Sequence, residues 1–135
     1  MKLIINTDGG ARGNPGPAGI GVVVANATGI ILHKYKKYVG EVTNNVAEYK
    51  ALILALEEVL KLFPEAELEI RMDSELIVRQ MQGRYKIKEP TLQMLAGEVI
   101  KLRSQFKQVV FHHVRREYNK EADKLVNEAI DERIN

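Results

Sequence analysis

The stretch that most constrains this chain lies near its start, where an apolar run leads into an acid and then into glycines. Leu3–Ile5 is short and aliphatic, which is typical of a buried strand, and Asp8 follows it closely. The segment Gly9–Gly16 is rich in glycine, so we expect a turn-prone loop that a second backbone can approach closely. Open α/β sheets bind ligands just past the carboxyl ends of their strands, and Asp8 is predicted to lie there. We therefore expect the rest of the chain to bring further carboxylates to Asp8.

Length and composition limit the classes of protein that remain. With 135 residues, the chain is predicted to form one domain, residues 1–135, around one core. A net charge of +2 does not by itself indicate nucleic-acid binding. The chain has no cysteine, which excludes a disulfide, a thiolate nucleophile and a cysteine-based metal site. No early apolar run is long enough for a signal peptide or a membrane span, so a cytoplasmic location is expected.

Apolar periodicity predicts an α/β fold in the order βββαβααβα, with a mixed five-stranded sheet flanked by helices. Strands are predicted over residues 2–8, 20–26, 30–39, 67–72 and 109–114. Helices are predicted over residues 46–62, 74–83 and 90–103, and a last helix follows Asn119 as its expected N-cap.

The third predicted strand carries several lysines. Alternation places Lys34, Lys36 and Tyr38 on one face. Such a face is either a solvated edge strand, whose lysines prevent aggregation, or a patch that binds nucleic acid. We favour the edge strand.

Aspartate is rare here and occurs at selected places. The chain has 18 acidic residues, of which only Asp8, Asp73, Asp123 and Asp131 are aspartates. Two of them follow apolar strands, and Asp123 falls in the first turns of the last helix. An all-oxygen ligand set suits Mg²⁺ or Mn²⁺ rather than zinc, and such sites commonly serve phosphoryl transfer.

Taken singly, most of these acids have an ordinary structural explanation. Asp73 can cap the helix that begins near Ser74, and Asp123 can favour its own helix dipole. Glu48 can form a capping box with Asn45. Only Asp8 lacks a comparable local role, because no helix follows it.

Other catalytic motifs do not fit. Gly10–Gly16 lacks the Lys-Ser/Thr of a phosphate-binding loop, and His112–His113 does not have the spacing of a zinc motif. No Gly-x-Ser-x-Gly elbow occurs.

Over its whole length the sequence resembles type 1 ribonuclease H. The resemblance rests on four motifs in the family's order: Thr7-Asp8-Gly9-Gly10 with Gly13-Asn14-Pro15-Gly16-Pro17, Thr43-Asn44-Asn45 with Ala47-Glu48, Met72-Asp73-Ser74, and Asn119-Lys120-Glu121-Ala122-Asp123. Each motif alone is weak, but four in order on the predicted pattern of elements are highly specific.

The resemblance implies an endonuclease that cuts the RNA strand of an RNA–DNA hybrid and leaves 5′-phosphate and 3′-hydroxyl ends. It implies two Mg²⁺ ions, with Mn²⁺ as a possible substitute, and a catalytic and metal-binding set that consists of Asp8, Glu48, Asp73 and Asp123. By the same resemblance, Glu48 also reaches a 2′-hydroxyl of the RNA. The implied substrate contacts are Gly13, Asn14, Asn44 and Asn45 on the RNA strand, Thr43 on a DNA phosphate, and Glu75. Neither a membrane nor an obligate protein partner is expected.

Some positions depart from the family pattern. Glu41 replaces a frequent arginine of the DNA-phosphate pocket, and Glu75 replaces a glutamine, so weaker, salt-sensitive hybrid binding is predicted. The basic protrusion of some family members is missing. Two alternatives remain open: a nuclease of the same fold that also cuts double-stranded RNA, and a non-catalytic hybrid-binding module.

The family usually places a mobile histidine in the loop before the last acid. His113 has the matching spacing to Asp123, but alternation places it within the fifth strand. Arg116 lies beyond that strand. We therefore predict that Arg116 takes the catalytic role, because its guanidinium can pair with the scissile phosphate.

Overall fold

Three long strands form the first part of the chain, where β-branched and small residues follow one another between turn signals. They are β1 (Lys2–Ala11), β2 (Gly16–Asn26) and β3 (Ile31–Val42). Each pairs antiparallel with the next along the chain.

Helices alternate with two further strands in the rest of the chain. Helix α1 (Asn44–Leu62) leads to β4 (Glu67–Met72), which pairs parallel to β1. Helices α2 (Glu75–Met81) and α3 (Pro90–Arg103) then lead to β5 (Val109–His113), which pairs parallel to β4.

After β5 come a short 3₁₀ turn, η1 (Arg116–Tyr118), and helix α4 (Lys120–Glu132). This computed structural model describes residues 1–133. The sheet order is β3-β2-β1-β4-β5, so the predicted mixed five-stranded sheet and order of elements are confirmed. None of the helices over residues 1–133 is both long and apolar enough to cross a membrane.

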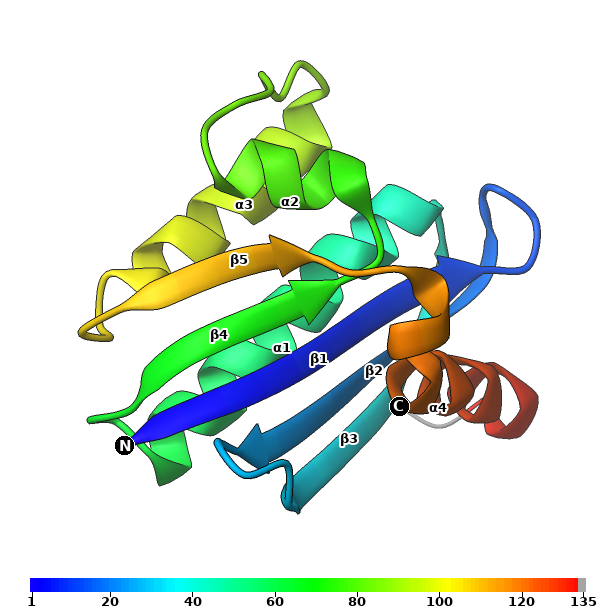
Figure 1. The fold of residues 1–135 in the computed structure, drawn as a ribbon. Coiled ribbons are helices and arrows are strands. Elements are labelled where there is room, and N and C mark those ends of the chain that lie inside the picture. Colours follow the sequence, from blue (N-terminus) through cyan, green and yellow to red (C-terminus); the bar gives the residue numbers. More distant parts are fainter. Residues whose placement is uncertain (134–135) are drawn as a thin grey trace.

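The two faces of the sheet are covered unequally (Figure 1). Helices α1 and α3 cover one face, where the main core is built from residues such as Leu3, Ile5, Leu52 and Ile70. Helix α4 lies on the other face, over β1–β3 (Figure 1). A Cβ added at Gly21 of β2 would lie 2.8 Å from Leu125 Cβ, so α4 packs directly on the backbone of the sheet.

Strand β1 differs from its prediction. It continues through Asp8 to Ala11, because residues 3–11 pair with β2 without a break. Asp8 therefore lies inside the strand rather than just past its end, and the predicted loop at Gly9 and Gly10 is wrong. The loop between β1 and β2 begins only at Arg12.

The lysine-bearing strand β3 is an edge strand, as predicted. Its lysines, however, are not simply solvated. Lys34 Nζ lies 3.0 Å from Glu121 of α4, and Lys36 Nζ lies 3.3 Å from Glu128 and 2.7 Å from Glu132. These ion pairs attach α4 to the edge of the sheet.

Candidate active site

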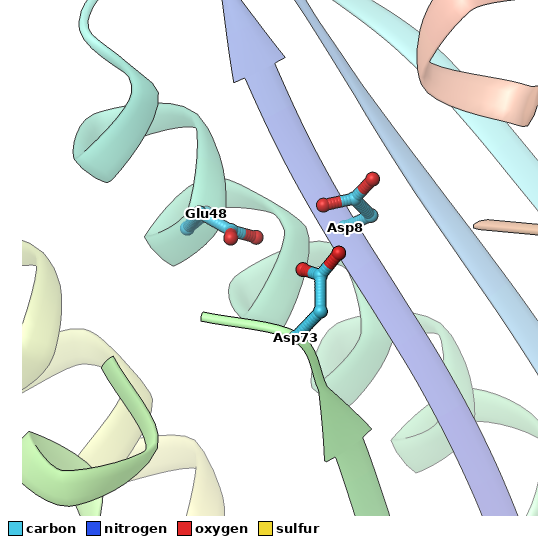
Figure 2. A group of neighbouring side chains, drawn as sticks. All are labelled: Asp8, Glu48 and Asp73. Carbon is cyan, nitrogen blue, oxygen red and sulfur yellow. The ribbon is translucent and has the colours of Figure 1, made fainter. Parts of the chain in front are cut away.

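Three carboxylates from separate elements meet at one place (Figure 2). Asp8 projects from β1 and Glu48 from α1, and Asp73 is the residue that follows β4. One oxygen from each lies within 4.8 Å of the others. Because β1 and β4 are parallel neighbours, Asp8 and Asp73 lie toward the same end of the sheet.

The backbone of Gly9 fixes two of these carboxylates. Its N–H donates to Asp8 Oδ1 at 3.0 Å and to Glu48 Oε1 at 2.8 Å. A Cβ at Gly9 would lie 2.5 Å from both the Ala47 carbonyl oxygen and the Glu48 nitrogen. The glycine is needed because α1 rests directly on β1 at this position, which confirms the expected close approach of a second backbone.

The local explanations of these acids do not hold. Thr43, not Asn45, is the N-cap of α1, and its side chain accepts from Val46 N at 3.2 Å. Glu48 is therefore not part of a capping box. Ser74, not Asp73, caps α2.

The site is electrostatically strained in the absence of a cation. Asp8 is only 7% exposed and Glu48 only 6%. Burial, reinforced by the charges of Asp73 and Asp123, raises the pKa of Asp8 to about 8. Burial and the charges of Asp8 and Asp73 raise the pKa of Glu48 well above its ordinary value. Within residues 1–133 none of the three carboxylates forms an ion pair with lysine or arginine, so this oxygen-only donor set fits a divalent cation.

Asp123 and Arg116 approach the cluster from the other side. Both line the same pocket as Asp8, a space of about 520 Å³. Arg116 Nη2 lies 3.9 Å from Asp123 Oδ1. Asp123 is not part of the tight group of three, but its charge reaches Asp8. His113 belongs to β5, as predicted, and is its last residue. It is not among the residues that line the pocket over positions 1–133.

The predicted substrate-contacting residues are divided between the pocket and its surroundings. Asn44 and Asn45 line the pocket. Asn14 Oδ1 accepts from Asn44 N at 2.9 Å, and Asn44 Oδ1 accepts from Ala11 N at 2.8 Å, so the loop between β1 and β2 is tied to the start of α1.

Four of the predicted contacts lie outside the pocket lining: Gly13, Asn14, Thr43 and Glu75. Glu75 begins α2 and lies 3.4 Å from Arg79 Nη2. Arg12, which is not among the predicted site residues, lines the pocket and pairs with Asp131 at 2.7 Å. No local sequence pattern predicts this ion pair, because Arg12 and Asp131 are far apart in the sequence.

The Asn119 side chain does not make the bond predicted for it. Asn119 is the N-cap residue of α4, as predicted, but its side chain makes no capping hydrogen bond there. Asn119 instead donates to the carbonyl of Thr7 in β1, at 3.0 Å.

Comparisons with known proteins agree with this geometry. The family model described as "Reverse transcriptase-like" matches residues 6–129. The bifunctional protein Rv2228c of Mycobacterium tuberculosis is 46% identical over 132 residues, which cover 97% of this chain but only 36% of that protein. The chain thus spans about a third of the length of this relative.

Two further matches cover nearly the whole of both chains. Ribonuclease H of Clostridium botulinum is 32% identical over 153 residues, covering 97% of each protein. The crystal structure of LC11-RNase H1 in complex with an RNA/DNA hybrid matches with a TM-score of 0.93 and 55% identity, covering 97% of this chain and 98% of the other. This chain therefore belongs to the type 1 ribonuclease H family.

Proposed function

We propose that the protein hydrolyses the RNA strand of RNA–DNA hybrids endonucleolytically, leaving 5′-phosphate and 3′-hydroxyl ends. The observation that carries the proposal is the close group of Asp8, Glu48 and Asp73, of which Asp8 and Glu48 are buried and Asp73 is half-buried, and which has no protein cation as partner. A module that only bound a polyanion would gain nothing from such a group. A family relative, LC11-RNase H1, was solved with an RNA/DNA hybrid, which supports the proposed substrate.

The cofactor we propose is a pair of Mg²⁺ ions, for which Mn²⁺ can substitute. Asp8, Glu48, Asp73 and Asp123 would hold them, since all four offer carboxylate oxygens to one pocket. When bound, divalent cations activate water and stabilise the charge of the departing oxygen. The Gly9 N–H orients Asp8 and Glu48 toward the same space before any ion arrives.

The residues around the cluster suit a nucleic-acid strand. Asn44 and Asn45 offer amide groups at the pocket wall, and Asn14 lies beside them. Glu48 is the group we propose for the RNA 2′-hydroxyl. Gly13 and Thr43 complete the proposed contacts.

Glu41 and Glu75 add negative charge where family members carry arginine and glutamine. We therefore propose that hybrid binding is weak and falls steeply with added salt. A cytoplasmic location and a one-domain protein remain predictions from the sequence.

A cleavage assay with end-labelled substrates tests the proposal. Matched RNA–DNA hybrid, RNA duplex and DNA duplex are incubated with Mg²⁺ or with EDTA, and the Asp8→Asn variant is the matched control. We expect Mg²⁺-dependent cleavage of the hybrid's RNA strand, with 5′-phosphate ends, and none by the variant. Hybrid binding without cleavage would favour the binding module, and equal cleavage of the RNA duplex would favour the broader nuclease.

A further inference from the structure

A buried asparagine links the strand that carries Asp8 to the helix that carries Asp123. Asn119 is only 1% exposed. Its Nδ2 donates to the Thr7 carbonyl at 3.0 Å, and its Oδ1 accepts from Asn6 Nδ2 at 3.0 Å. Both partners belong to β1, so one side chain from the start of α4 pairs with two consecutive residues of the central strand.

These bonds lie next to two of the acids. Thr7 immediately precedes Asp8 in β1. The backbone N–H of Asp123 donates to the Asn119 carbonyl at 3.1 Å, which is the first turn of α4. The Asn119 side chain thus binds the residue next to Asp8, and the Asn119 backbone binds Asp123 one helical turn further along the chain.

The same strand also holds the turn before α4. Asn6 Nδ2 lies 3.4 Å from the carbonyl of Tyr118, the last residue of η1. This turn begins with Arg116, whose guanidinium lies near Asp123.

Helix α4 forgoes an ordinary stabilising interaction for this arrangement. Asparagine at an N-cap normally accepts from a free N–H of the first turn, but the Asn119 side chain makes no such bond. The side chain is committed to β1 instead. Helix α4 is also attached to β3 by ion pairs of Lys34 and Lys36, whose side chains are partly exposed to solvent. Lys36 reaches α4 beyond its first turn, at Glu128 and Glu132, and Lys34 reaches the first turn only at Glu121, whose side chain is half exposed. The buried tie between this turn and β1 is made by Asn119.

We propose that Asn119, supported by Asn6, is a positioning residue that sets the Asp123 carboxylate at its working distance from Asp8. Neither asparagine is among the residues that line the pocket at positions 1–133, so both act through Asp123. The inference rests on the proposed nuclease function and on the role of Asp123 in holding a cation. Residues that orient metal ligands typically change metal affinity or activity about 10- to 100-fold when replaced.

The test compares Asn119→Ser with Asp123→Asn and with the double variant. Serine can cap α4 but is too short to pair with Thr7 and Asn6, so a helix-capping role would be preserved. Cleavage of labelled hybrid is measured with Mn²⁺, with which we expect Asp123→Asn to retain measurable activity. The Mg²⁺-induced rise in Tm is measured in parallel, since an ion that binds only the folded state raises Tm.

We expect Asn119→Ser to lower kcat about tenfold while KM changes less than about twofold. Its Mg²⁺-induced rise in Tm should fall to that of Asp123→Asn. In the Asp123→Asn background, adding Asn119→Ser should change kcat by less than about twofold, because residues that act as a unit are not additive. Asn6→Ala, a milder change on the strand, should show the same non-additivity with a smaller loss.

Lys36→Met is the control, because it removes two ion pairs of α4 far from its first turn and should leave kcat unchanged. Wild-type kcat in Asn119→Ser, or independent losses in the double variant, would overturn the positioning role. A wild-type protein that neither cleaves hybrid nor gains stability from Mg²⁺ would instead overturn the proposed function itself.

Discussion

The candidate site has two parts that are built differently. Asp8, Glu48 and Asp73 stand on the sheet and on the helix packed against it, and a single N–H orients two of them. Asp123 and Arg116 come from α4 and the turn before it, and their side chains are 35% and 81% exposed. The buried part accumulates like charge that a bound cation or a proton relieves, whereas the exposed part can adjust to a substrate.

This contrast separates two ways of impairing the enzyme. Changes in the buried part should remove either the donor set or its rigid geometry. Changes in the exposed part should leave a folded protein with a working but slower site.

Neutralising any one of the three clustered carboxylates should abolish activity. We expect Asp8→Asn, Glu48→Gln and Asp73→Asn each to reduce hybrid cleavage below about a thousandth of wild type, because each removes a charged donor from the same group. Circular dichroism should show an intact fold. Asp123→Asn should retain partial cleavage with Mn²⁺, and near-wild-type activity in any of the first three would contradict the assignment.

Replacing Gly9 should damage both the fold and the site. The added methyl of Gly9→Ala collides with the backbone of α1 at Ala47 and Glu48, so the helix must move away from β1. We expect a loss of about 3 kcal/mol, or roughly 10 °C in Tm. Gly10→Ala is the matched control, since its Cβ would meet only a Val126 methyl group at 3.6 Å. Equal melting temperatures for the two variants would refute the close approach.

The sequence predicts the fold well because its main signals are local. Apolar periodicity predicts the order of the strands and α-helices, and Pro90 marks the start of α3, which spans its predicted range of 90–103. Local signals do not predict where β1 ends. Gly9 and Gly10 have the composition of a loop, yet they belong to the strand because they pair with β2. This pairing and the approach of α1 are long-range interactions, which local sequence patterns do not show.

The site divides in the same way. Family motifs point to Asp8, Glu48 and Asp73, although local capping roles explain two of them equally well until Thr43 and Ser74 are seen to be the caps. The role of Asn119 cannot be predicted locally, because its partner Thr7 lies 112 positions away in the sequence.

The buried part should also make stability depend on pH in the absence of metal. The folded-state pKa of Asp8 is raised to about 8, so between about pH 4 and pH 8 the folded state holds a proton that the unfolded state releases. Stability should therefore be highest at the low end of this range and fall as the pH rises through it. Asn at position 8 carries no such proton. In EDTA, we expect the Tm of Asp8→Asn to exceed that of wild type by roughly 5 °C at pH 9 and by little at pH 5. A constant difference at both pH values would argue against strained carboxylates, and added Mg²⁺ should reverse the order.

The smallest effect is expected in the exposed part, at Arg116. Its guanidinium lies 3.9 Å from Asp123 at the pocket wall, where it can pair with the scissile phosphate as charge develops. We expect Arg116→Ala to lower kcat about tenfold and to change KM less than about twofold, since the contact strengthens in the transition state. His113→Ala should leave both constants nearly unchanged, because His113 ends β5 away from the pocket lining. An arginine cannot shuttle a proton near neutrality, so the wild-type rate should show no inflection near pH 6.5, where an ordinary histidine titrates. The opposite pattern, with His113→Ala crippled and Arg116→Ala active, would show that the sequence spacing of the family histidine outweighs its place in the strand.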